Sequence, residues 1–103
     1  TKAEDLIAAT GPCICFDCFE VGIEIGRRFA EEFRSEELVK PGKTGKAYVD
    51  IRAAIEIQLE ECGVLPQNIS AMPLCTFERS DLFYSYRRDR TKTGAMVSVL
   101  KLI

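Results

Sequence analysis

Two segments of helical periodicity, each flanked by short apolar runs, constrain the fold of this chain more than any other feature. In the first segment, apolar side chains recur every four residues, and charged residues such as Arg27, Arg28, Glu31 and Glu32 fill the positions between them. This pattern predicts an amphipathic helix over about residues 18–34. The recurring side chains are Val21, Ile25, Phe29 and Phe33.

Capping residues indicate where the helices begin and end. Asp17, followed three residues later by Glu20, has the pattern of a capping box for the first helix. Asp50 is the predicted N-cap of a second helix, and Gly63 stands where a C′ glycine would end it. The apolar stripe of this second helix consists of Ile51, Ile55 and Leu59, widened by Ala54.

Short apolar, β-rich runs predict four strands. They cover residues 6–10, 47–49, 69–74 and 95–103. Alternating strands and helices predict an α/β fold of the α+β type, with helices packed on a mixed β-sheet in layers. At 103 residues the chain is one domain at most. The segment 40–46 contains Gly42-Lys43-Thr44, but it lacks the earlier glycine of a phosphate-binding loop and is predicted to be a solvated turn.

Charge and cysteine content exclude several functional classes. A net charge of −2 argues against nucleic acid as a partner, because phosphate backbones require an excess of Lys and Arg. No apolar run approaches the ~20 residues of a membrane span. Five cysteines, an odd number, favour a reducing, cytoplasmic location over a secreted disulfide framework. The chain begins at Thr1 without an initiator Met, which predicts a fragment, a processed product or an artificial boundary.

A dense group of thiols is the first candidate site. The chain has no histidine, so it cannot build a Ser-His or Cys-His pair or a histidine-ligated zinc site by itself. Cys13, Cys15 and Cys18 could hold a soft metal ion if Cys62 or Cys75 supplied a fourth ligand. They are also candidate reactive thiols, since the predicted helix N-terminus would lower the pKa of Cys18. Packed cysteines without chemistry are the third interpretation.

The second candidate site is the aromatic and arginine-rich segment 80–90. If residues 84–88 are extended, Tyr84, Tyr86 and Arg88 share one face, and Ser85 and Arg87 occupy the other. Tyrosine rings beside a guanidinium can stack on a ring and grip a phosphate or carboxylate. A surface loop with Arg–Asp pairs is the alternative.

The two candidate sites carry a resemblance to the laccase-domain family, whose members are also called YfiH-like proteins or polyphenol oxidases. Several stretches resemble that family in their order and separation along nearly the whole chain. They are GPCICFDCFEVG at 11–22, the helix beginning at Asp50, Leu74-Cys75-Thr76, DLFYSYRRD at 81–89, and Thr93-Gly94. The chain differs from the family's more usual pattern in its 14–18 segment and at Ile55, Arg90 and Ala95.

The resemblance implies that residues 1–103 are the C-terminal portion of one laccase domain, within a layered α/β sandwich. The complete family is implied to be a zinc-dependent purine nucleoside phosphorylase with adenosine deaminase activity. Its zinc ligands, two histidines and a cysteine, lie in an N-terminal half that this chain lacks, so no family metal ligand is expected here. The isolated chain is expected to be inactive, and its partners are the missing half, a purine nucleoside and phosphate.

The resemblance also implies roles for the residues of the second candidate site. Arg88 first, then Arg87, is expected to bind substrate or phosphate, Tyr84 and Tyr86 to line the base or ribose, and Ser85 to donate a hydrogen bond. Two alternatives stay open at this point. One is a copper polyphenol oxidase, and the other is a non-catalytic, cysteine-rich metal-binding module.

Overall fold

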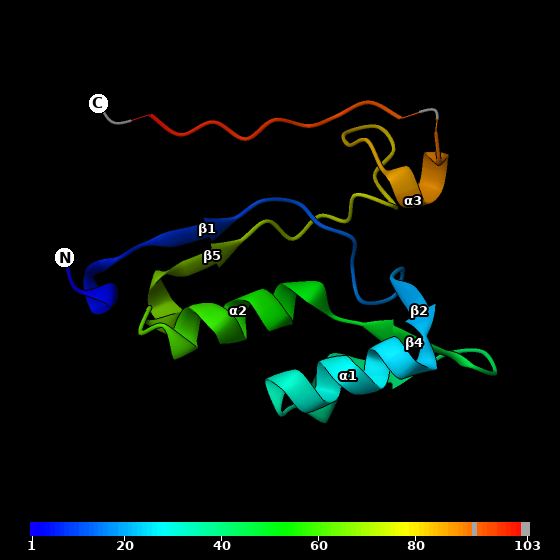
Figure 1. Ribbon diagram of the computed structural model, residues 1–103. Coiled ribbons are helices and arrows are strands. Elements are labelled where there is room, and N and C mark those ends of the chain that lie inside the picture. Colours follow the sequence, from blue (N-terminus) through cyan, green and yellow to red (C-terminus); the bar gives the residue numbers. More distant parts are fainter. Residues whose placement is uncertain (92, 102–103) are drawn as a thin grey trace.

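The computed structural model describes residues 1–91 and 93–101, and it confirms the α/β fold class (Figure 1). In the described ranges no helix is long and apolar enough to cross a membrane. The helices are α1 (Ile23–Phe33), α2 (Ile51–Glu61) and the short α3 (Tyr86–Asp89), with 3₁₀ turns at Ala3–Asp5, Glu36–Leu38 and Pro66–Asn68. The strands are β1 (Ala8–Thr10), β2 (Glu20–Gly22), β3 (Val39–Pro41), β4 (Lys46–Val49) and β5 (Ile69–Ala71).

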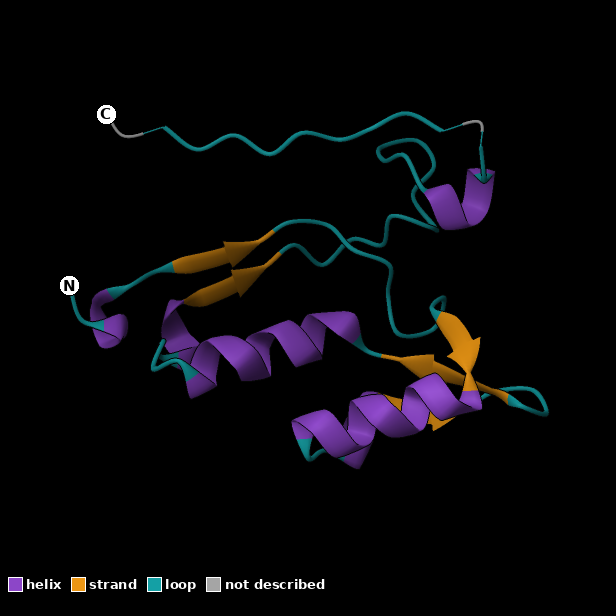
Figure 2. Cartoon of the chain, viewed as in Figure 1, coloured by secondary structure: helices purple, strands orange, loops and turns teal. Residues whose placement is uncertain are grey.

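The strands form two separate small sheets rather than one (Figure 2). β1 and β5 pair in parallel, with Ala8 opposite Ile69. β2, β4 and β3 form an antiparallel sheet in that spatial order, with Val21 opposite Ala47. The predicted mixture of parallel and antiparallel pairing is therefore present, but each kind has its own sheet. α1 packs on the three-stranded sheet. In the view of Figure 1, α2 is drawn below the β1–β5 pair.

The first helix begins at Ile23, five residues later than its periodicity predicts. Residues 20–22 form strand β2 instead, and Val21 is buried there. Pairing with β4 satisfies their backbone groups and buries the apolar side chain that also fits the helical stripe. Asp17 consequently caps no helix, and its carboxylate pairs with Lys40. The capping box prediction is wrong.

The second helix follows its sequence signals closely. The Asp50 carboxylate accepts a hydrogen bond from the backbone N–H of Ala53 at 3.1 Å, which is N-cap geometry. The helix ends at Glu61, and Gly63 has a φ of 100°, in the region that favours glycine. A Cβ at Gly63 would lie 2.9 Å from that of Ala3, so the position has neither the backbone geometry nor the space for a larger residue.

The core is small and lies between α1, α2 and the three-stranded sheet. Val49 is its one fully buried large side chain in the described part of the chain. The radius of gyration is 15.4 Å, compared with about 13 Å for a compact domain of this length. The other buried apolar residues are Val21, Leu38, Ala47, Ala54, Val64 and Cys75.

The C-terminal segment lies outside the core. Residues 95–101 form no strand, which contradicts this part of the predicted 95–103 strand; residues 102 and 103 fall outside the described residues. The segment runs back along the molecule in the direction opposite to β1 without joining its sheet (Figure 1). Val97, Val99 and Leu100 are 85%, 86% and 97% exposed. A β-rich sequence needs a neighbouring strand to satisfy its backbone, and 95–101 has none among the described residues.

Candidate functional site

Three cysteines and a glutamate converge at one point of the fold. The Sγ atoms of Cys15, Cys18 and Cys75 and a carboxylate oxygen of Glu78 all lie within 4.8 Å of one another. The thiols of Cys15 and Cys18 donate to Glu78 Oε1 at 3.3 and 3.2 Å. The backbone N–H of Cys15 donates to Cys75 Sγ at 3.3 Å. We call these four residues the thiol cluster.

The parallel β1–β5 pair brings the two halves of the thiol cluster together. Beyond the ends of these strands the chains stay adjacent, so Cys13 forms an isolated parallel bridge with Cys75. The Thr76 N–H donates to the Cys13 carbonyl at 3.2 Å. Each segment then makes a tight turn, closed by Cys18 N–H to the Cys15 carbonyl and by Arg79 N–H to the Cys75 carbonyl. Both turns thereby present their side chains to the same point.

The thiols of the cluster have different acidities. Burial, followed by the hydrogen bond to Glu78, raises the pKa of Cys18. Burial is also the largest cause of the raised pKa of Cys15. For Cys75, burial acts to raise the pKa, but backbone N–H groups, that of Cys15 foremost, outweigh it and lower the pKa below its ordinary value. Cys75 is therefore the most acidic thiol of the three.

The sequence prediction for this site is partly right. Cys15 and Cys18 do meet Cys75, one of the two cysteines expected to complete the group. Cys13 contributes its backbone and not its thiol, and Cys62 is exposed at the end of α2, away from the cluster. Cys18 precedes β2 and not a helix, so the predicted lowering of its pKa is wrong.

Glu78 is the member of the thiol cluster that sequence reasoning missed. A signal was available in the spacing, since Cys15 and Cys18 are three residues apart, and so are Cys75 and Glu78. In a tight turn, side chains three residues apart lie on the same side. The two pairs therefore face each other once β1 and β5 have paired.

The arginine-rich segment contains a helical turn, so the extended conformation that the sequence analysis considered for residues 84–88 does not occur throughout. α3 is one turn long, and the buried Ser85 is its N-cap, accepting a hydrogen bond from the Arg88 N–H at 3.3 Å. The two alternating faces that an extended segment 84–88 would have are therefore absent over residues 86–88, which lie in α3. Ser85 is an acceptor here, which satisfies an N–H that a helix N-terminus leaves free.

The Arg88 guanidinium makes several hydrogen bonds within the chain. Its Nη1 donates to the carbonyls of Thr76 and Phe77 at 2.9 and 3.1 Å, and its Nη2 donates to that of Phe83 at 2.9 Å. Nε and Nη2 donate to the two oxygens of Asp89 at 3.0 and 2.7 Å. A guanidinium has five N–H donors, and these bonds are five in number. Arg88 thus fastens α3 to the turn that carries Cys75 and Glu78.

Arg87 and the two tyrosines of the segment are exposed. Arg87 Nη1 donates to the Glu20 carbonyl at 2.7 Å, and its guanidinium lies 5.0 Å from the Phe19 ring centroid, within the range of a cation–π contact. Tyr84 and Tyr86 are 54% and 64% exposed. Arg87 uses one of its five N–H donors on a described residue, and a guanidinium with spare donors at the surface can receive an anion.

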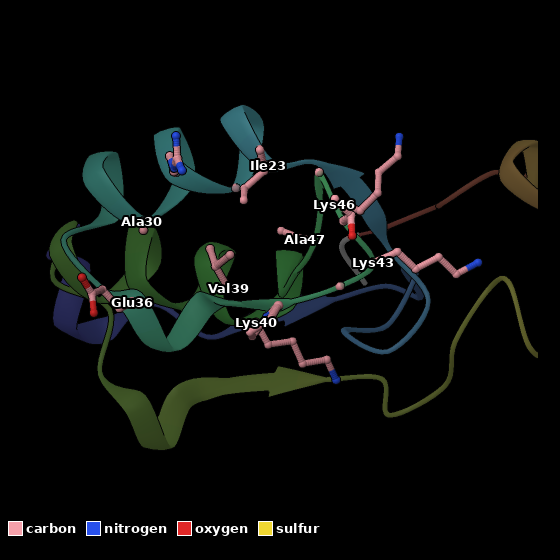
Figure 3. A pocket seen from close by; sticks show the side chains of 14 residues that line it. Ile23, Ala30, Glu36, Val39, Lys40, Lys43, Lys46 and Ala47 are labelled. Atoms are coloured by element: carbon pink, nitrogen blue, oxygen red, sulfur yellow. The ribbon is translucent and has the colours of Figure 1, made fainter.

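A hollow of about 510 Å³ lies elsewhere, between α1 and the β3–β4 hairpin (Figure 3). Val39, Ala47 and Ala30 line its apolar wall, while the chains of Lys43 and Lys46 extend outward. The Gly42-Lys43-Thr44 stretch is the hairpin turn on its rim, as predicted, closed by the Lys46 N–H on the Lys43 carbonyl at 2.8 Å. This hollow contains none of the thiol cluster or of residues 84–88 among its described lining.

These observations define the class of protein. The chain is an α/β unit with a cysteine-rich turn after its first strand and an Arg-Arg-Asp helical turn near its end, and many of its large apolar side chains are exposed. It belongs to the family described as multi-copper polyphenol oxidoreductase laccase, whose profile matches residues 1–103. The resemblance seen in the sequence is thereby confirmed.

Curated relatives carry two kinds of enzyme name. The chain is 40% identical over 94 residues to "Adenosine deaminase RL5" from an unknown prokaryotic organism, covering 84% of this chain and 36% of that protein. It is 32% identical over 100 residues to a "Purine nucleoside phosphorylase" of Bacteroides thetaiotaomicron, covering 95% and 37%. It is 35% identical over 104 residues to "Purine nucleoside phosphorylase YfiH" of Shigella flexneri, covering 99% and 41%.

Solved structures share the fold. Bacillus licheniformis hypothetical protein YfiH matches with a TM-score of 0.78 and 26% identity, over 91% of this chain and 36% of that one. YlmD from Geobacillus stearothermophilus matches with a TM-score of 0.72 and 29% identity, over 84% and 33%. The chain spans little more than a third of the length of these relatives.

Proposed function

We propose that this chain is the C-terminal part of a zinc-dependent purine nucleoside phosphorylase with adenosine deaminase activity. Its role is to supply scaffold and an arginine that binds phosphate or substrate. The single observation that carries the proposal is the match of all 103 residues to a family whose relatives are named for these two activities.

The catalytic metal of this proposal is held outside these 103 residues. The family resemblance implies zinc ligands of two histidines and one cysteine, and the chain contains no histidine. The relatives are about three times as long as the matched segment, which leaves room for a catalytic portion elsewhere. When bound, the zinc would act on the substrate as a Lewis acid.

The exposed apolar residues support a missing partner segment of the same domain. Ile7 before β1 and Val97, Val99 and Leu100 near the C-terminus are each more than four-fifths exposed. Burying a side chain of this size contributes about 1.5–3 kcal/mol, so leaving several in water is costly. The remainder of a laccase domain packed on this face would recover that free energy.

Among the arginines, the hydrogen bonds favour Arg87 over Arg88 as the ligand-binding residue. The sequence prediction ranks Arg88 first, yet all five of its donors already have acceptors within the chain. Arg87 makes a single hydrogen bond among the described residues, to the Glu20 carbonyl. We therefore assign phosphate binding to Arg87, ligand contacts to Tyr84 and Tyr86, and a positioning role to Arg88 and its cap Ser85.

The test uses the full-length gene product that contains these residues. Inosine and adenosine are supplied with phosphate, and ribose 1-phosphate and inosine formation are followed by chromatography. Arg87→Ala should raise KM for phosphate about tenfold or more, the loss expected for a charge-assisted hydrogen bond. Its melting temperature should fall less than that of Arg88→Ala, because Arg87 makes one internal hydrogen bond and Arg88 makes five. Arg88→Ala should instead lower the melting temperature.

Arg28→Ala is the matched control, because Arg28 is an exposed arginine on α1, a helix that carries neither candidate site. It should leave both KM and melting temperature unchanged. Unaltered phosphate KM in Arg87→Ala would refute the assignment of that residue. Absence of both phosphorolysis and deamination in the zinc-loaded wild type would refute the proposed function.

A copper polyphenol oxidase is the second candidate, favoured by the description of the matching family. Copper binds imidazole and thiolate ligands well, and this chain offers thiolates but no imidazole. In that case phenol oxidation by the full-length gene product should disappear when copper is chelated and return when it is restored. Oxidation that persists without copper would eliminate this candidate.

A further inference from the structure

We propose that Cys15, Cys18, Cys75 and Glu78 form a zinc site that stabilises the fold of this chain. This site is additional to the catalytic zinc of the proposed function, since its ligands all come from these 103 residues. It does not depend on that function, and its test has a readout that requires no activity.

The donor set has the chemistry of a soft divalent metal site. Three thiolates and one carboxylate are ligands that Zn²⁺ accepts, and sulfur-rich sets discriminate against Mg²⁺ and Ca²⁺. Cys13 and Cys62, the remaining thiols, lie outside the group. The cluster also stands on two independent segments sixty residues apart, so the arrangement is not a consequence of local sequence proximity.

The distances are close to those of a tetrahedral zinc ion. With a Zn–S bond of about 2.3 Å, tetrahedral ligand atoms lie about 3.8 Å apart. The four ligand atoms of the cluster lie within 4.8 Å of one another. Changes of at most about 1 Å in the distances between ligand atoms, within reach of side-chain rotation, therefore complete the coordination sphere.

Four protein ligands make this a closed site. Catalytic zinc sites keep one position open for water or substrate, whereas structural sites fill all four with side chains. A bound ion would cross-link the turn at 15–18 to the turn at 75–78. The carbonyls of Thr76 and Phe77 in the second turn hold the Arg88 guanidinium. The ion would thus hold in place the turn at 75–78, to which Arg88 attaches α3 and with it Arg87.

The decisive measurement is the zinc content of the full-length gene product. The protein is purified under reducing conditions and dialysed first against buffer that contains zinc and then against zinc-free buffer. Mass spectrometry of the metal should find one more equivalent of zinc in the wild type than in Cys75→Ser. Cys62→Ser is the matched control, because Cys62 is exposed and outside the cluster, and it should retain the full content. Equal zinc in the wild type and in Cys75→Ser overturns the proposal.

Cobalt reports on the ligands independently. Co²⁺ exchanged into the wild type should give thiolate-to-cobalt charge-transfer absorption, which Cys75→Ser should reduce and Cys62→Ser preserve. If Cys75→Ser fails to fold by circular dichroism, Glu78→Gln decides the matter, because Glu78 is exposed and its loss leaves the three thiols in place. This variant should weaken zinc binding by more than about tenfold in chelator competition.

The competing use of close thiols is a disulfide. Titration of free thiols distinguishes zinc binding from a disulfide. After chelation, a zinc-bound protein yields all its cysteines as free thiols, whereas a protein that contains a disulfide does not. Recovery of a Cys15–Cys18 or Cys15–Cys75 disulfide from protein prepared with zinc and reductant overturns the proposal. Unchanged zinc affinity in a folded Glu78→Gln variant excludes the carboxylate as the fourth ligand and overturns it as stated.

Discussion

Replacing Gly26 by alanine sets two opposing effects of known size against each other. Gly26 lies buried in the middle of α1, where that helix packs on the three-stranded sheet. A Cβ at this position would meet Ala47 Cβ at 3.0 Å and Val39 Cγ1 at 3.1 Å. Ordinary carbon contacts are about 3.5–4.0 Å, so both approaches are too close by about half an ångström.

The expected result is a net loss of stability of about 1 kcal/mol. Alanine in a helix interior is favoured over glycine by about 1 kcal/mol. Forcing an extra methyl group into a packed interface costs about 1–3 kcal/mol. Val39 and Ala47 belong to hydrogen-bonded neighbouring strands, so neither can withdraw alone, and the steric effect should be the larger.

Urea unfolding followed by circular dichroism measures this difference. Gly11→Ala is the control, because a Cβ at Gly11 meets nothing within 4 Å; it should be neutral or stabilise by up to about 1 kcal/mol through the unfolded chain. If Gly26→Ala is more stable than the wild type by about 1 kcal/mol, the gain in helix propensity exceeds the steric cost. The close packing of α1 on β3 and β4 would then be refuted.

Two further predictions concern carboxylates. Asp50→Ala should destabilise the protein by about 1 kcal/mol, because it removes the N-cap of α2. Asp17 caps no helix, so Asp17→Ala should change the stability by less than about 0.5 kcal/mol in the same urea assay. The hydrogen bond from Arg88 lowers the pKa of Asp89 in the folded protein. The pair therefore contributes to the free energy of unfolding above the unfolded-state pKa near 4, and this contribution is lost as the pH falls through the folded-state pKa. Stability measured from pH 6 to about pH 2 should thus fall less in Asp89→Asn than in the wild type, and parallel profiles would contradict the pairing.

The helix capping signals illustrate how far local sequence determines this fold. The start of α2 at Asp50 was predictable, because an N-cap acts within three residues of itself. The same reasoning failed at Asp17. There, the backbone of Val21 pairs with Ala47 of a predicted strand, a pairing that no local pattern identifies, and a strand replaces the first helical turn. The difference between the two sites is whether a distant strand competes for the backbone.

By itself the sequence determined the α/β class, the family, the absence of histidine and the two segments proposed as candidate sites, since these depend on composition and on patterns of neighbouring residues. Only the tertiary structure decided which cysteines meet and that Glu78 joins them. It also decided that all five N–H donors of Arg88 find acceptors within the chain, whereas Arg87 makes one hydrogen bond to a described residue. These are contacts between segments up to 67 residues apart. Their free energy depends on how β1 pairs with β5 and on where the turns after those strands lead, and neither is encoded in any short stretch of residues.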